Sequence, residues 1–307
     1  MKSNEENERV FEDYLRSLGR RDGELAIGDD GVLVPSTIAN RILKQVYDLS
    51  PILQRSKIYH MKGKLRIPYY DEADKGITAA FAEDFKEVVL SVEKLKSIEL
   101  DGYLARASYF IPLQLVNNTK FPIVDFIVKE IVDTISSFIE NEILNGTEGK
   151  IEGLSKLENK ITSAASNDIT ADEIIDLWYK VKWYKVNWEF QRDAIWIMHP
   201  YTSQVLRRLK DDAGRYLLEP YYDIAGSFSS TLLGRPVYVS DNMPKMEGGK
   251  TAIYYGDMSG LAVKISDIEF SIDKGSYISS NAAGVFVFLR FDAKVQDPQK
   301  IAKLVMC

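Results

Sequence analysis

The chain has 307 residues, of which 45% are hydrophobic, and a formal net charge of −6. This composition can bury a substantial core, and the acidic balance argues against a surface whose main task is to grip nucleic acid. With one cysteine, Cys307, and two histidines, His60 and His199, an internal disulfide and a cysteine-based zinc site are excluded. The apolar stretches are too short to span a membrane and the N-terminus lacks a signal-peptide core, so we expect synthesis in the cytoplasm.

Residues 1–30 are charged and thinly apolar, which predicts an exposed arm holding at most one short amphipathic helix. Regular structure is expected to begin just after this arm. Ser36 or Thr37 can cap a helix that continues through Val46, and Pro51 is expected to stop it.

Residues 57–100 predict a long hairpin with a charged tip. Lys62-Gly63 favours a turn between two strand-like runs, residues 71–76 are polar, and residues 88–93 alternate with a period of two. Because a lone hairpin is marginal in water, it must lie on something else. That support is either a neighbouring subunit or, if the segment is a local meander, its own domain.

Residues 122–145 predict one long amphipathic helix. Its apolar stripe is a row of isoleucines at every fourth position, namely Ile123, Ile127, Ile131, Ile135, Ile139 and Ile143. Pro122 suits the first turn, and Gly146 suits the position after the last turn. Some 24 residues at about 1.5 Å each make a rod of roughly 36 Å. It is either a buried core helix or a spine against which an extended sheet lies.

The second half of the chain mixes helices and strands. Thr170 and Glu173 form a capping box before a helix whose apolar stripe includes Ile174, Leu177 and Trp178. Aromatic residues at this spacing are more often core or interface than a stacking platform. Strand-like runs then dominate to the C-terminus, so strands and helices are segregated and the fold class is α+β.

Chemical motifs are absent from the sequence. Gly249-Lys250-Thr251 ends like a phosphate-binding loop, but Pro244 stands where that loop needs its first glycine. The acidic pairs Asp211-Asp212 and Glu83-Asp84 are typical of solvated loops. We therefore expect no catalytic, cofactor-binding or metal site, and no enzyme.

Seven stretches, taken in order, resemble the tailed-bacteriophage major capsid proteins of the HK97-like fold. They are GVLVPSTIANRILKQVYDLSPI (31–52), KGKLRIPYYDEADKGITAAFAEDF (62–85), FIENEILNGTEGKIEGL (138–154), RRLKDDAGRYLLEP (207–220), LLGRPVYVSDNMP (232–244), YYGDMSGLAV (254–263) and LRFDAKVQDP (289–298). The resemblance runs from about residue 28 to the end of the chain. No single stretch is specific, but their common order makes chance a poor explanation.

The resemblance implies a flat subunit with a peripheral domain, an axial domain, an extension loop and an N-terminal arm. The peripheral domain would lay its long spine helix on long strands. The implied ranges are 1–30 for the arm, 31–56 for the entry to the peripheral domain, 57–96 for the extension loop, 97–153 for the peripheral domain with the spine helix, 154–265 for the axial domain and 266–307 for the return of the peripheral domain.

The implied function is self-assembly into pentamers and hexamers of an icosahedral shell that encloses double-stranded DNA, in a phage or prophage. Partners would be other copies of the chain, with a portal, a scaffold or a maturation protease; no cofactor or membrane is implied. The protein would be made in the host bacterial cytoplasm and end in the virion. At the loop tip we expect contacts to a neighbouring subunit from Tyr70, Asp71, Glu72, Asp74, Lys75 and Ile77, while the arm reaches under another subunit.

Some members of this family cross-link a loop lysine to a neighbour's asparagine, assisted by a glutamate. Lys75 and Asn281 are the matching positions here, but Phe288 stands where the acid is expected. We therefore expect no cross-link. Two alternatives to the phage capsid stay open: an encapsulin-like nanocompartment shell protein, which shares the fold, and a cytosolic α+β hydrolase.

Overall fold

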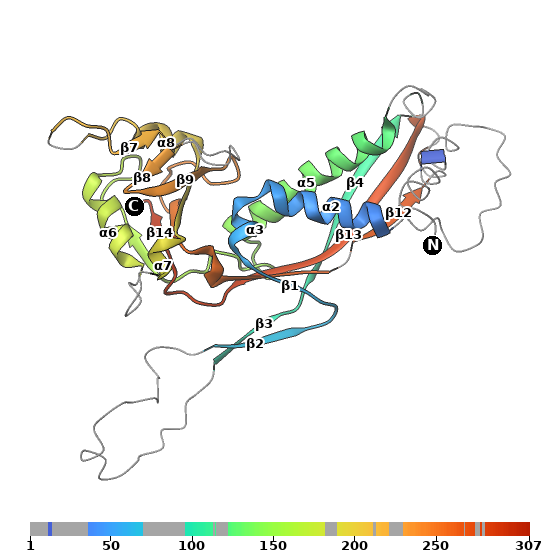
Figure 1. The fold of residues 1–307 in the computed structure, drawn as a ribbon, viewed down its shortest axis with the longest axis horizontal. Coiled ribbons are helices and arrows are strands. Elements are labelled where there is room, and N and C mark those ends of the chain that lie inside the picture. Colours follow the sequence, from blue (N-terminus) through green and yellow to red (C-terminus); the bar gives the residue numbers. More distant parts are fainter. Residues whose placement is uncertain are drawn as a thin grey trace, which may run out of the picture.

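The computed structural model describes residues 12–13, 36–69, 96–112, 114, 122–181, 189–210, 213–220, 230–266, 268–273, 277 and 280–307. Within these residues the strands form a five-stranded, a seven-stranded and a two-stranded sheet. The first two sheets organise two bodies that lie side by side, and the two-stranded ribbon projects away from both (Figure 1). The described part of the molecule is therefore elongated, and the ribbon is a limb on it.

The first body packs helices on one face of a sheet built around a long strand. β13 (Ala282–Val295) pairs antiparallel with β11 (Leu261–Ile265), β12 (Glu269–Asp273) and β4 (Tyr103–Pro112), and β1 (Lys57–His60) adds to β11 in parallel. The covering helices are α2 (Ser36–Leu49), α3 (Pro51–Arg55) and α5 (Ile123–Asn145).

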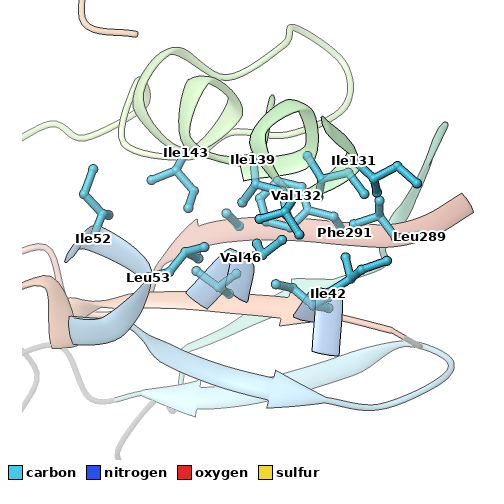
Figure 2. Packing of buried hydrophobic residues seen from close by; sticks show 14 of the residues in the cluster. Ile42, Val46, Ile52, Leu53, Ile131, Val132, Ile139, Ile143, Leu289 and Phe291 are labelled. Atoms are coloured by element: carbon cyan, nitrogen blue, oxygen red, sulfur yellow. The ribbon is translucent and has the colours of Figure 1, made fainter. Parts of the chain in front are cut away.

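The predicted isoleucine row explains the position of α5. All six isoleucines are buried in the main core cluster. Figure 2 shows Ile131, Ile139 and Ile143 of α5 packing with side chains of α2, α3 and β13. Gly146 ends the helix with a positive φ of 66°, and its N–H bonds the carbonyl of Glu142. The long helix is thus both a core helix and a support for the long strands.

The strands β4 and β13 alternate between a covered and an open face, as side chains on a strand must. Tyr103, Ala105, Ala107 and Tyr109 of β4 face the helices and pack on the core. Leu104, on the opposite face, is 60% exposed. Among the described residues, the face of this sheet away from the helices is therefore open except where the base of the ribbon covers Ala262, Lys264 and Asp292.

The second body has its own sheet and core. Its strands are β5 (Lys160–Thr162), β14 (Ile301–Val305), β10 (Thr251–Gly256), β6 (Ile195–Met198), β9 (Arg235–Val239), β8 (Ser230–Leu232) and β7 (Leu218–Pro220), in this spatial order. Its helices are α6 (Ala171–Lys180), α7 (Glu189–Arg192) and α8 (Pro200–Leu206). The capping box of Thr170 and Glu173 is confirmed at the start of α6. Trp178 packs against this core, as expected for an aromatic residue at helical spacing.

The strand pairs show where the chain crosses between the two bodies, and they group the strands differently from the implied ranges. Residues 57–60 form β1, which pairs with β11 of the first sheet, so the ribbon begins at Leu65 and not at residue 57. β11 belongs to the first sheet although it lies within 154–265, and β14 belongs to the second although it lies within 266–307. The apolar pattern identifies each strand, but pairing is decided by where the chain crosses between the bodies. The helix through Val46 also resumes as α3 directly after Ser50.

Candidate assembly surfaces

The ribbon is the feature least able to stand alone. β2 (Leu65–Tyr69) pairs antiparallel with β3 (Lys96–Leu100), and these two strands form a sheet separate from the others. Its small apolar cluster consists of Ile67 and Leu100 packed on Ala262 of β11. Arg66 and Glu99, opposite each other, form an exposed ion pair at 2.8 Å. Two strands with so little core need support along their length.

The base of the ribbon is held by buried polar groups. Lys264 of β11 donates from Nζ to the carbonyl oxygens of Gly63, Leu100 (3.4 Å) and Asp101 (3.0 Å). Asp292 of β13 lies opposite Lys264 and accepts from the backbone N–H of Asp101 at 2.8 Å. The direction in which the ribbon leaves the first body is therefore defined by contacts to two adjacent strands.

A second candidate surface is the open face of the first sheet. Phe110, Tyr277 and Phe286 form an aromatic cluster with ring centroids 4.7 Å apart for Phe110 and Tyr277, and 6.4 Å for Phe110 and Phe286. Arg106 lies over the ring of Phe286, with its Cζ 5.9 Å from the centroid. Phe110 is 46% exposed. Exposed aromatic residues beside arginine are typical of protein–protein contacts.

The junction between the two bodies is organised by one buried glutamate. Glu140 of α5 is 5% exposed and accepts from Ser50 Oγ at 3.0 Å, from Tyr238 OH at 2.9 Å and from Ser240 Oγ. Asn242 Nδ2 lies 3.3 Å from the same carboxylate. Burial and the Glu140 carboxylate raise the pKa of Tyr238. This cluster ties α5 and the α2–α3 junction of the first body to β9 of the second.

The loop-tip residues predicted to contact a neighbour, Tyr70, Asp71, Glu72, Asp74, Lys75 and Ile77, lie outside the described residues. So does the predicted arm, residues 1–30, except for residues 12–13. Asn281 is exposed at the start of β13, with a positive φ of 52°. Phe288 pairs across the sheet with Glu269 of β12. Strand pairing thus brings a carboxylate beside this position, which the spacing along one strand did not show.

Sites for other chemistry are not found in the described part of the chain. There, no group of three or more His, Cys, Asp or Glu residues is placed to hold a metal ion. Among the described helices, none is long and apolar enough to cross a membrane. The His60 ring forms a hydrogen bond with the hydroxyl group of Tyr47. His199 caps α8 by accepting from the N–H of Tyr201 at 3.0 Å. Both histidines therefore act within the fold.

Comparison with known proteins identifies the family. Residues 30–306 match the model of the phage capsid family. The structure is similar to the capsid of an empty GTA particle, with a TM-score of 0.65 and 18% identity over 83% of this chain and 96% of that chain. It is also similar to a structure of Microbacterium phage Oxtober96, with a TM-score of 0.58 and 12% identity over 94% and 96%.

A third similar structure is the holo-SrpI encapsulin complex of Synechococcus elongatus PCC 7942, with a TM-score of 0.55 and 14% identity over 84% of this chain and 88% of that chain. Comparison with curated proteins gives no match. The likeness to solved structures shows the fold, and the family match covers most of the sequence. The chain belongs to the phage capsid family, and its fold is that of the HK97-like major capsid proteins.

Proposed function

We propose that this major capsid protein assembles as pentamers and hexamers of an icosahedral shell around double-stranded DNA, in a tailed phage or prophage. Membership of the phage capsid family makes it a structural protein and not an enzyme. The observation that carries the proposal is the ribbon of β2 and β3, which projects from the first body. Among the described residues, only three buried side chains form the core beneath this ribbon. Such a limb is stabilised when a second copy covers it.

In this proposal the first body is the peripheral domain, the second is the axial domain and the ribbon is the base of the extension loop. Tyr70, Asp71, Glu72, Asp74, Lys75 and Ile77 would contact the adjacent subunit, and residues 1–30 would reach under another. Each contact can be modest, because a closed symmetric shell makes many contacts at once and a subunit leaves only when several break together.

The charge of the chain suits a container. With 45 acidic against 39 basic residues, the protein repels packaged DNA on average and would confine the genome without gripping it. The further partners in this proposal are a portal, a scaffold or a maturation protease. We place the protein in the virion, after synthesis in the host bacterial cytoplasm.

Negative-stain electron microscopy of the purified full-length chain tests the proposal. We expect closed shells or capsomer rings, and we expect the double variant Tyr70→Ala, Ile77→Ala to give fewer of them. Leu49→Ala, which removes an exposed apolar side chain from α2, is the control. A wild-type chain that stays monomeric at all concentrations would refute the assembly function.

The similarity to an encapsulin supports one alternative, a nanocompartment shell that encloses proteins. The contents of purified particles separate the two functions. Double-stranded DNA inside particles from the native host supports the phage capsid, whereas a co-purifying cargo protein without DNA supports the nanocompartment.

A further inference from the structure

The chain passes twice between the first body and the ribbon, and one buried lysine contacts both passages. The outgoing passage contains Gly63, and the returning passage contains Leu100 and Asp101. Lys264, 1% exposed, sends its Nζ to one backbone carbonyl of each of these three residues. An ammonium group has three N–H donors. Donors and acceptors are therefore matched one to one, although Gly63 lies far in sequence from the other two acceptors.

The backbone leaves room for this arrangement. Gly102 has a φ of +84°, and a Cβ placed there would lie 3.2 Å from Lys264 Nζ. A Cβ at this position would crowd the ammonium group of Lys264. The backbone conformation at Gly102 is also one that L-residues rarely adopt. The glycine thus permits both the tight return of the chain and the close approach of the lysine.

Asp292 completes the arrangement from the neighbouring strand. It is 1% exposed, and its Oδ2 accepts from the N–H groups of Asp101 at 2.8 Å and Gly102 at 3.4 Å. Its Oδ1 accepts from the N–H of Ala293 at 2.9 Å. Both carboxylate oxygens thus accept hydrogen bonds. In the returning passage, Lys264 of β11 binds the backbone carbonyl groups and Asp292 of β13 binds the backbone N–H groups.

The carboxylate of Asp292 favours the charged form of Lys264. Burial lowers the pKa of Lys264, and the carboxylates of Asp292 and Asp101 oppose that shift. Burial raises the pKa of Asp292, and the N–H groups of Asp101 and Gly102 oppose it. Two charges taken out of water are costly, and well-packed apolar residues often give equal or greater stability. Because burying these two charges costs free energy, we infer that they set the direction of the ribbon more than they stabilise the fold.

We propose that Lys264 and Asp292 are positioning residues that clamp the base of the ribbon and fix its angle to the β11–β13 pair. Apolar packing of Ile67 and Leu100 on Ala262 holds the ribbon near the sheet but sets no direction. Hydrogen bonds to both passages do set one. The clamp belongs to the single chain; its consequence for a shell, which is where one subunit's ribbon meets the next, rests on the proposed function.

The distance between two spin labels, measured by pulsed electron paramagnetic resonance, tests the clamp. In the full chain carrying Cys307→Ser, the substitutions Ser97→Cys on β3 and Asp133→Cys on α5 place labels on the exposed ribbon and the exposed face of the helix. Labelled chain is diluted into unlabelled chain, so that only distances within one subunit are recorded. Lys264→Met is the test variant.

Lys303→Met is the matched control. Lys303 is also buried, at 8% exposed, and donates from Nζ to the carbonyl of Ser155 at 2.6 Å, but it lies in the second body. We expect one narrow distance distribution in the parent and in Lys303→Met, and a broad or shifted one in Lys264→Met. Equal distributions in the parent and Lys264→Met would overturn the clamp.

If Lys264→Met does not fold, Asp292→Asn decides the matter by the same measurement. It keeps the shape of the side chain but removes a carboxylate that favours the charged form of Lys264. A broadened distribution supports the clamp, and an unchanged one refutes it. A parent chain that forms no shells would remove the proposed function but leave this measurement valid, since it is made within one subunit.

Discussion

The buried carboxylate of Glu140 gives the sharpest stability prediction. Glu140→Leu replaces the carboxylate on α5 with an apolar side chain of similar size, and it removes the acceptor for four donors. Of these, the hydroxyl groups of Ser50 and Ser240 belong to buried residues, at 1% and 4% exposed, and cannot turn to water. A buried donor without a partner costs about 1–3 kcal/mol, so the variant should lose about 2–6 kcal/mol of unfolding free energy. The half-buried Tyr238 and Asn242 can reach solvent and add less.

Glu142, on the same helix, supplies the control. It is 7% exposed, its Oε1 accepts from Thr147 Oγ1 at 2.9 Å, and its Oε2 has no hydrogen-bond partner among the described residues. Glu142→Gln keeps the one hydrogen bond and removes a poorly compensated charge. Its unfolding free energy should therefore change by less than about 1 kcal/mol.

Urea unfolding followed by tryptophan fluorescence and by circular dichroism measures both variants. Trp196 is fully buried in the second body and donates to the carbonyl of Leu232 at 2.9 Å, so its emission reports on that body. Because Glu140 joins the bodies, Glu140→Leu should also separate the two unfolding transitions. A loss no greater than that of Glu142→Gln, with coincident transitions, would show that the Glu140 cluster does not couple the bodies.

Three further predictions concern other parts of the chain. Gly153 has a φ of +52°, and a Cβ there would lie 2.6 Å from a carbonyl oxygen of α5, so Gly153→Ala should lower the free energy of unfolding by more than about 3 kcal/mol. Gly149 has a φ of +74° but open space around it, so Gly149→Ala should cost about 1–2 kcal/mol. Equal losses in thermal unfolding would contradict the steric argument. Burial raises the pKa of Tyr47 to about 12, so the folded state keeps this phenol neutral to a higher pH than the unfolded state does. The stability of the fold is therefore unaffected by this group below about pH 10 and falls as the pH rises from about 10 to about 12. Tyr47→Phe should flatten this alkaline loss, and an unchanged pH profile would refute it. Boiling assembled shells in SDS should release monomers only, because Phe288 stands where the acid for a reaction of Lys75 with Asn281 is expected. Covalent multimers would show that another carboxylate serves, and Glu269, which pairs with Phe288, is the first to test.

Much of the fold could be predicted from local pattern. The row of isoleucines from Ile123 to Ile143 identifies α5, and the capping box at Thr170 identifies the start of α6, because both depend on residues close in sequence. The order of the resembling stretches indicated the capsid fold. The strand partners of β1, β11 and β14 were not predictable, because an apolar strand fits either sheet equally well.

The polar contacts were missed for a related reason. Lys264 stands between Val263 and Ile265 in an alternating strand, where a lysine usually marks the solvent face. It is buried only because the base of the ribbon, some 160 to 200 residues away in sequence, covers that end of the sheet. Asp292 lies within the resembling stretch at 289–298, but the resemblance assigned it no role. Contacts between distant segments leave no spacing to recognise.

These buried polar contacts have different consequences from the apolar core. Burial of the isoleucines of α5 stabilises the first body, but apolar burial is non-directional and tolerates small rotations. The Glu140 cluster fixes the second body against α5, and the Lys264–Asp292 pair fixes the ribbon against β13. A closed shell depends on the angles between parts of the subunit, because each error is repeated by every copy around a symmetry axis. The subunit therefore has directional hydrogen bonds at the two places where rotation would change the shape it presents to its neighbours.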